Sequence, residues 1–341
     1  MDNIYNVVKL DEQSITHKYL QISNCVIEAL KEKKLEVNYP LPSINDMSFE
    51  LDVSRDTVEK AYRHLKKLHI LDSVPGKGYY IIENEFIREI NVFLLFNKLS
   101  FHKKIVYDSL VATLGEKAAI DFYIYNNDYN FFKKLILNNK QNYTHYVIIP
   151  HFVEGGNNSH EILNTLPSEK LILLDKLVKG VEGDYAAVYE NFEEDLYQAL
   201  LEATPLLEKY KQVNLIFPSD TYYPVEILAG FHQYCRELEM DYSVIHNIQN
   251  AEIKKGQVYI NVMEDDLVVL LEKILLAKFK PGVDVGILSY NETPLKKIIL
   301  NGISTISTDF KLMGRKTADI ILSKKNERYA VPFKLTLRES L

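Results

Sequence analysis

Three polar residues, Ser54, Arg55 and Thr57, stand in the first turn of a predicted helix. Ser54 is a favoured N-cap residue, and apolar residues recur at helical spacing from Val58 onwards. The side chain of Lys60 is predicted to face outward, close to the same turn. Hydroxyl and guanidinium groups at the start of a helix can bond phosphate oxygens and base edges, and the helix N-terminus itself attracts phosphate. This spacing therefore indicates contact with a nucleic acid.

A shorter predicted helix comes just before this one. Ser43 is its N-cap, and Asp46 three residues later completes a pair that is typical of helix starts. Asp52 and Val53 make the turn between the two helices. A longer helix over 16–33, with one apolar face, precedes both. This order of elements predicts a helix-turn-helix.

A basic, glycine-flanked turn follows the helices. Strands are predicted at about 71–74 and 79–82, with Pro75-Gly76-Lys77-Gly78 between them. Taken alone, this is an ordinary hairpin with a solvated lysine. Directly after a helix-turn-helix it favours a wing, because glycine lets a sugar-phosphate backbone come close and Lys77 supplies positive charge.

Residues 16–82 resemble the DNA-binding head of the GntR family of bacterial transcription regulators. The family pattern of Leu-Pro-Ser, Val-Ser-Arg-x-Thr-Val and Gly-x-Gly is matched in order and spacing at 41–43, 53–58 and 76–78. The resemblance implies a winged helix-turn-helix that contacts DNA through Ser43, Arg55, Thr57, Gly76, Lys77 and Gly78. From the same helix starts we add Asn45, Ser54 and Lys60.

Two positions depart from the family pattern. Asn45 stands where the family usually has arginine, although its amide can still bond a phosphate or an adenine, and Glu59 stands where a basic residue is usual. Over residues 1–82, 11 Lys and Arg stand against 12 Asp and Glu, which leaves a net charge of −1. Because phosphate contacts dominate affinity for DNA, we expect modest affinity per head and a homodimer that reads two half-sites.

Composition sets limits on the whole chain. Its 341 residues suggest two or three domains, and its net charge of −7 argues against indiscriminate nucleic-acid binding. The two cysteines, Cys25 and Cys235, are predicted to be reduced and buried. The N-terminus has no secretion signal, and no apolar run is long enough to span a bilayer. We therefore expect a cytoplasmic protein.

From residue 86 the pattern changes to short apolar runs that alternate with helical stretches. Strand candidates such as 90–96, 120–125 and 145–149 are separated by crossover helices, which predicts parallel sheets. The number of strands is about twice that of one doubly wound unit, so we expect two α/β lobes with a cleft between them. The predicted domains are a winged helix-turn-helix at 1–85 and a ligand-sensing domain at 86–341, with lobe one at about 90–190 plus 290–322 and lobe two at about 191–289 plus 323–341.

Polar and aromatic side chains follow several of the predicted strands. In open parallel sheets, ligands lie beyond the carboxyl ends of the strands. Carboxylates and amides can bind sugar hydroxyls in a bidentate manner, and aromatic faces can stack on the C–H side of a sugar ring. Asp220, Asp265 and Asn291 could equally be helix N-caps. The ligand-binding candidates are Asn97, Phe101, Asp175, Asp220, Tyr222, Tyr223, Asp265 and Asn291.

This second part resembles the sensor of LacI/GalR-type repressors, which is itself similar to periplasmic sugar-binding proteins. The best-matched segments are 228–231, 264–267 and 283–314. The resemblance implies a periplasmic-binding-protein-like type I fold and places Asp265 and Asn291 at ligand-binding positions. Ile227 stands where sugar-binding relatives often have arginine, so other groups must hold the ligand. A GntR-type head on such a sensor is similar in design to arabinose-responsive repressors, which favours an arabinose- or fucose-like effector by analogy alone.

The sequence therefore predicts a sequence-specific DNA-binding transcription regulator. The favoured form is a repressor of a sugar-utilisation operon, released from its operator by a sugar or sugar phosphate bound between the two lobes. The alternative is an interaction or DNA-binding protein with a degenerate pocket. An enzyme is disfavoured, because no phosphate-binding glycine loop or nucleophile elbow is present and the nine histidines lack metal-ligand spacing. No metal, cofactor or membrane partner is expected.

Overall fold

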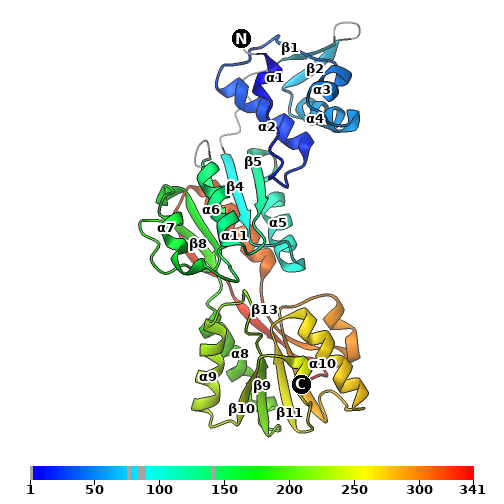
Figure 1. Ribbon diagram of the computed structural model, residues 1–341, viewed down its shortest axis with the longest axis vertical. Coiled ribbons are helices and arrows are strands. Elements are labelled where there is room, and N and C mark those ends of the chain that lie inside the picture. The colour runs from blue at the N-terminus through cyan, green and yellow to red at the C-terminus, as the bar shows by residue number, and fades with distance from the viewer. Residues whose placement is uncertain (1–2, 75–77, 83–89, 140–142) are drawn as a thin grey trace. The chain divides into compact units, whose positions relative to one another are not determined.

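A computed structural model gives the fold and describes residues 3–74, 78–82, 90–139 and 143–341. The chain divides into two compact units. The first comprises Met1–Phe96, Leu114–Tyr125 and Lys134–Ile148, and the second comprises Asn97–Thr113, Asn126–Lys133 and Ile149–Leu341. Figure 1 shows the elements along the chain, from the blue N-terminus to the red C-terminus.

The N-terminal head is a winged helix-turn-helix. Its three strands form an antiparallel sheet in the order β1-β3-β2. One apolar core joins its helices, and Ile22, Val26 and Val58 are completely buried in it. The elements are α1 (Ile4–Val7), α2 (Lys18–Lys31), β1 (Pro40–Leu41), α3 (Ile44–Glu50), α4 (Arg55–Lys67), β2 (Leu71–Val74) and β3 (Gly78–Ile81).

Both predicted helix caps in the head are confirmed. The hydroxyl of Ser43 accepts a hydrogen bond from the backbone N–H of Asp46 at 3.2 Å. The hydroxyl of Ser54 accepts one from the N–H of Thr57 at 3.1 Å. Each bond satisfies an N–H that has no partner inside its own helix, so the cap residues set where α3 and α4 begin.

A parallel sheet of six strands follows the head, in the order β14-β8-β7-β6-β4-β5. Its strands are rich in valine, isoleucine, leucine and phenylalanine, as expected for strands that are covered on both faces. The strands are β4 (Ile90–Phe96), β5 (Ala118–Ile124), β6 (His145–Ile148), β7 (Leu171–Asp175), β8 (Ala186–Tyr189) and β14 (Arg328–Ala330). The helices are α5 (Phe101–Leu114), α6 (Tyr129–Asn138), α7 (Ser159–Leu163) and α11 (Phe310–Ser323).

A second six-stranded sheet has the order β10-β9-β11-β12-β13-β15. Its pairs are parallel except for β13 and β15, which are antiparallel. Its helices are α8 (Phe192–Leu207), α9 (Glu226–Glu237) and α10 (Glu264–Leu276). Its strands are β9 (Gln212–Ile216), β10 (Tyr242–Ile245), β11 (Gln257–Asn261), β12 (Val285–Tyr290), β13 (Ser304–Thr308) and β15 (Phe333–Thr336).

The chain has a winged head followed in sequence by two sheets whose strand pairs are mostly parallel, which confirms the predicted fold class. The assignment of residues to the two lobes differs from the prediction at the C-terminal end. β13, which lies within the range assigned to lobe one, belongs to the second sheet. β14, which lies within the range assigned to lobe two, pairs with β8 in the first sheet. The chain thus passes between the lobes after β13 and returns after β14.

The cysteines and the helices can also be compared with the sequence predictions. Cys25 and Cys235 are both free, with Cys235 buried and Cys25 half-buried.

Within the described part of the chain, no helix is both long enough and apolar enough to cross a bilayer.

Candidate functional site

A small cavity with about 30 Å³ of free space lies in the second unit. We call it the crevice. It is lined by side chains at or just after the ends of β4, β6, β7, β8, β9 and β12, so it lies at the carboxyl ends of strands from both six-stranded sheets. Its lining residues are Lys98, Ser100, His102, Lys103, His151, Asp175, Glu190, Phe192, Tyr222, Tyr223, Tyr290, Asn291 and Phe310.

Asp175 is the charged centre of the crevice. It ends β7 with a φ of 77°, a left-handed conformation that is uncommon for a residue other than glycine. Its carboxylate pairs with Nζ of Lys103 at 2.7 Å and bonds Nε2 of His151. All three side chains are buried. Burial raises the pKa of Asp175, but Lys103 and His151 outweigh it and hold the pKa below its usual range, so the carboxylate stays ionised.

Glu190 lies beside Asp175 and is protonated more readily. Its backbone N–H donates to the carbonyl oxygen of Asp175 at 3.0 Å. Burial, and then the charge of Asp175, raise the pKa of the Glu190 carboxyl well above its usual value. The two neighbouring acids therefore prefer different charge states. A neutral carboxyl group can both donate and accept a hydrogen bond, which suits it to a hydroxyl-bearing ligand.

Several buried polar atoms of the crevice lack a partner. Among the described residues, no hydrogen bond reaches Oε2 of Glu190, Oη of Tyr290 or Oδ1 of Asn291. These three side chains are 6%, 1% and 7% exposed. Since buried polar groups are normally satisfied, three orphan atoms around one cavity point to a polar molecule that completes them.

Aromatic rings form one wall of the crevice. Tyr222 stacks on Tyr223 with 4.9 Å between ring centroids, and Tyr223 contacts the edge of Tyr290 at 6.1 Å. The ammonium of Lys98 lies 4.2 Å from the centroid of Tyr222. The three tyrosine rings thus lie next to the orphan polar atoms.

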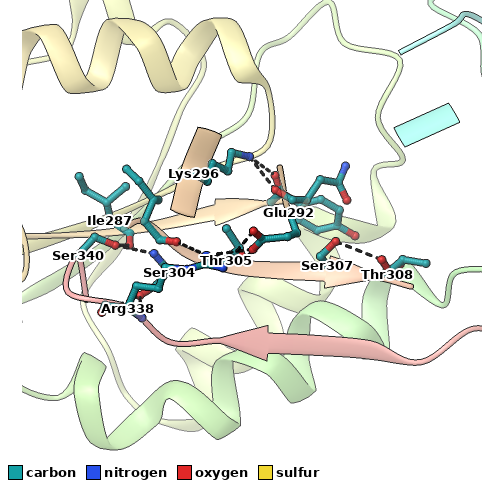
Figure 2. A network of polar contacts seen from close by, with 12 residues as sticks. Ile287, Glu292, Lys296, Ser304, Thr305, Ser307, Thr308, Arg338 and Ser340 are labelled. Carbon is teal, nitrogen blue, oxygen red and sulfur yellow. Dashed lines mark hydrogen bonds and ion pairs between the residues drawn. The ribbon is translucent and has the colours of Figure 1, made fainter. Parts of the chain in front are cut away.

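A buried lysine fixes the loop that carries Tyr290 and Asn291. Nζ of Lys296 donates to the carbonyl oxygens of Tyr290 and Asn291 at 2.9 and 2.7 Å, and pairs with Oε1 of Glu264 at 2.7 Å. Lys296 is only 1% exposed. Figure 2 shows this loop next to β13. The lysine therefore positions two lining residues without lining the crevice itself.

A second ion pair ties the same region to the C-terminal residues. Arg338 and Glu292 form a two-point pair, with both N···O distances at 3.0 Å. Glu292 also bonds the hydroxyl of Thr305 in β13 (Figure 2). Arg338 donates to the carbonyl of Ile303 at 2.7 Å. Paired geometry of this kind holds the guanidinium and the carboxylate in one orientation.

Of the eight predicted ligand-binding residues, the structure brings Asp175, Tyr222, Tyr223 and Asn291 together in the crevice. The other four do not line it. Asn97 is buried and donates to Asn127 at 2.7 Å, and Phe101 is 49% exposed. Asp220 and Asp265 are exposed, the latter in the first turn of α10.

The sequence analysis missed the residues that hold Asp175 and those that complete the wall. His151 lies two residues after the predicted strand at 145–149, but a single histidine gives no reason to choose it. Glu190 follows the strand at 186–189 in the same way. The missed lining residues are Lys98, Ser100, His102, Lys103, His151, Glu190, Phe192, Tyr290 and Phe310.

The predicted DNA-contact residues of the head lie on its surface. Arg55 is exposed and makes no ion pair or hydrogen bond to any residue that the structure describes, whereas Lys60 pairs with Asp56 at 2.6 Å. The hydroxyls of Ser54 and Thr57 lie 2.8 Å apart.

The remaining head residues belong to the start of α3 and to the wing. Ser43 and Asn45 are exposed at the start of α3. Gly78 has a φ of 86°, which suits glycine in a turn. Gly76 and Lys77 lie outside the described residues.

Comparison with known proteins identifies the head. Residues 18–81 match the family model described as bacterial regulatory proteins of the gntR family. The uncharacterised HTH-type transcriptional regulator YcxD of Bacillus subtilis (strain 168) is 35% identical over 66 residues, which are 19% of this chain and 15% of that protein. The regulator YhcF of the same organism is 30% identical over 79 residues, 23% of this chain and 65% of that protein. The chain thus spans less than two thirds of either relative.

The body has the fold of the lac repressor. A structure of the dimeric lac repressor with an 11-residue C-terminal deletion matches with a TM-score of 0.62 at 14% identity, over 74% of this chain and 98% of that one. A LacI family transcriptional regulator from Enterococcus faecalis V583 with bound ribose matches with a TM-score of 0.58 at 17% identity, over 73% and 98%. The chain therefore joins a DNA-binding helix-turn-helix head to a body of LacI-like fold. The head is of the GntR type.

Proposed function

We propose that the chain is a cytoplasmic, sequence-specific DNA-binding repressor of a sugar-utilisation operon. Its head binds operator DNA through the start of α4, the start of α3 and the wing. Its crevice binds a monosaccharide or sugar phosphate, and this effector lowers the affinity for the operator. The observation that carries the proposal is a GntR-type head joined in one chain to a body whose crevice has unpartnered buried polar atoms.

The chemistry of the crevice supports a sugar as the ligand. Glu190 and Asn291 offer a carboxyl and an amide that can take hydroxyl groups, while Asp175 supplies a fixed negative charge. Tyr222 and Tyr223 supply ring faces for the C–H side of a sugar. The LacI family structure from Enterococcus faecalis V583 contains ribose, and its fold is the one found here. Lys98 is a partly exposed cation that suits a phosphate substituent.

The small size of the cavity supports a response to the ligand. Its free space of about 30 Å³ holds about two or three waters, since one water needs roughly 10–15 Å³ by this measure. A sugar can enter only when side chains such as Tyr222 and Lys98 move. A ligand that binds one conformation better than another shifts the population toward it, which couples the crevice to the rest of the molecule.

Exposed apolar side chains support a homodimer formed by the body. Val268 and Leu276 on α10 are 56% and 83% exposed, and Ile298 in the following turn is 73% exposed. Lys296 of that turn pairs with Glu264 at the start of α10, which places the two segments together. Exposed apolar groups gathered in this way are typical of interaction surfaces, and a second copy would bring two heads to two half-sites.

Two measurements test the proposal. A duplex selected from a random pool should bind the full-length chain with a clear sequence preference. A panel of pentoses, 6-deoxyhexoses, hexoses and their phosphates should then include one that weakens this binding by roughly 5–150-fold. Titration calorimetry with the active compound should show saturable heat in the micromolar to millimolar range. A selective duplex with no response to any panel member would favour the alternative, a DNA-binding protein with a degenerate pocket.

Two variants test whether the sugar binds in the crevice or elsewhere on the surface. Glu190→Gln keeps the shape of the side chain but changes its hydrogen-bonding groups, and should weaken sugar binding at least tenfold. Asp220→Asn changes an exposed carboxylate outside the crevice and should leave sugar binding unchanged. Equal losses in both variants, or none in either, would contradict the assignment of the crevice as the effector site.

A further inference from the structure

The segment before the winged helix lies against the edge of the first parallel sheet. The backbone N–H of Ile15 donates to the carbonyl of Phe122 in β5 at 2.8 Å. The hydroxyl of Thr16 accepts from the N–H of Phe122 at 2.7 Å and donates to the carbonyl of Ile120 at 3.3 Å. Since β5 is the edge strand, these bonds satisfy backbone groups that the sheet itself leaves open.

The same segment is held tightly to the first long helix of the head. The side-chain amide of Gln21 in α2 donates to the carbonyls of Asp11 and Thr16 at 3.2 and 2.8 Å, and accepts from the N–H of Asp11 at 2.9 Å. Tyr123 of β5 completes the arrangement, because its hydroxyl donates to the carboxylate of Asp11 at 3.0 Å. Both ends of the segment are therefore fixed to α2 and to β5 at once.

These contacts are buried and join distant parts of the chain. Thr16, Gln21 and Tyr123 are 8%, 7% and 3% exposed. Thr16 and Phe122 are 106 residues apart in sequence. A further ion pair joins Lys67 of α4 to Glu116 at 2.8 Å, but both side chains are exposed and such pairs contribute little. Lys31 of α2 also donates to Oδ1 of Asn91 in β4, at 3.5 Å. The side-chain hydrogen bonds of Thr16 and Tyr123 are the buried part of the connection between the segment 11–16 and β5.

The chain leads directly from the crevice to this connection. Lys103, which pairs with Asp175, lies in the first turn of α5. The helix continues without interruption to Leu114 and is followed by Glu116 and β5. A single helix and the strand after it therefore link a crevice residue to the residues that hold the head.

We propose that residues Asp11–Thr16 form a latch that fixes the DNA-binding head to β5, and that the latch transmits changes at the crevice to the head. The coupling of the latch to the crevice rests on the proposed function. The attachment of the head to β5 does not. The latch gives the head an attachment in addition to the chain that leads from β3 to β4. Opening it frees the head from the sheet without unfolding either part.

Hydrogen exchange on the full-length chain tests the latch. Thr16→Val preserves the shape of the side chain but removes the acceptor for the N–H of Phe122, and Tyr123→Phe removes the bond to Asp11. Peptides that cover Ala118–Ile124 should exchange at least about tenfold faster in both variants. Ser23→Ala is the matched control, because it removes a buried hydroxyl whose bonds in the described part of the chain are to the carbonyls of Tyr19 and Ala61, both in the head. It should leave exchange in β5 unchanged.

Unchanged exchange in both latch variants would overturn the latch, as would an equal acceleration in Ser23→Ala. The coupling is tested with the selected duplex and the active panel sugar. Thr16→Val should bind the duplex within threefold of the wild type in the absence of sugar. The factor by which the sugar weakens binding should fall at least threefold, and an unchanged factor would overturn the coupling. Should no sugar act on the wild type, the proposed function fails while the exchange experiment still decides the latch.

Discussion

The head and the crevice use charged residues in opposite ways. On α4, the side chains of Lys60 and Asp56 are 52% and 68% exposed, whereas those of Lys103 and Asp175 in the crevice are 10% and 4% exposed. Exposed pairs contribute little to stability and exchange partners readily. Buried pairs hold their geometry, because an uncompensated charge in the interior is costly. The head can thus give up its ion pairs for phosphates, while the crevice keeps a fixed electrostatic pattern.

The largest expected effect concerns the buried charges of the body. Lys296→Met removes the ammonium that binds two carbonyls and Glu264, and should lower the free energy of unfolding by about 2–5 kcal/mol, because two carbonyls lose their buried donor. Urea denaturation measures the loss. Lys297→Met, which changes the exposed neighbour, is the control and should cost less than about 0.5 kcal/mol. A small loss at Lys296 would show that the buried charge is not needed to hold the loop.

The second prediction concerns pH. Burial, helped by the nearby charges of Lys296 and Lys103, lowers the pKa of His102 to about 4. The unfolded chain, with a pKa of about 6.5, binds more protons between pH 6.5 and 4. Stability should therefore fall as the pH drops through this window, by up to about 3 kcal/mol from this residue.

Denaturation curves at pH 7, 5.5 and 4.5 check the pH prediction. His102→Gln should flatten the fall in stability over this range. His69→Gln changes an exposed histidine of the head and should keep the shape of the wild-type curve. Identical profiles for the wild type and His102→Gln would contradict the buried, neutral state of this histidine.

The third prediction concerns the exposed charged residues of α4. Arg55→Ala should weaken binding to the selected duplex by about 1–3 kcal/mol, because Arg55 is exposed, close to the N-terminus of α4 and free to reach a base or phosphate. Stability should change by less than about 0.5 kcal/mol. Arg63→Ala is the matched control, since its guanidinium already pairs with Glu59 at 2.7 Å. An equal loss in both variants would mean that the start of α4 has no special role.

The smallest expected effect comes from Glu59, the acidic residue that pairs with Arg63. Glu59→Gln removes a negative charge from α4 and releases Arg63, so the affinity for the duplex should rise by less than about 1 kcal/mol. The dependence of affinity on salt should become steeper as Arg63 gains a phosphate contact. Fluorescence anisotropy at several salt concentrations measures both. Weaker binding would mean that Glu59 itself contacts the DNA.

Much of the fold could be predicted from the sequence because its strands and helices have strong patterns. The bounds of β4 agree with the prediction residue for residue, since it is an apolar run interrupted only by Asn91. β13 was missed because it reads Ser-Thr-Ile-Ser-Thr. Three of its four polar side chains are buried, and Ser304 and Thr305 bond to Glu292, Arg338 and Ser340, which lie 13 to 36 residues away. No local pattern carries that information.

The candidate site could be predicted only in outline. Strand ends were the correct places to search, but the path of each loop decides which side chain enters the crevice. After β9, Tyr222 and Tyr223 enter and Asp220 does not. Glu190 and Lys103 gain their importance from Asp175, which belongs to a different secondary-structure element from either of them. Such groupings depend on packing, which a single sequence does not reveal.

The contact between Lys98 and Tyr222 has a practical consequence. The chain contains no tryptophan, so Tyr222→Trp would place its single indole at the crevice, under the ammonium of Lys98. Emission from that indole would change whenever a compound displaced the lysine or shielded the ring from water. A library of colourless metabolites could then be screened by fluorescence before any promoter or gene is known.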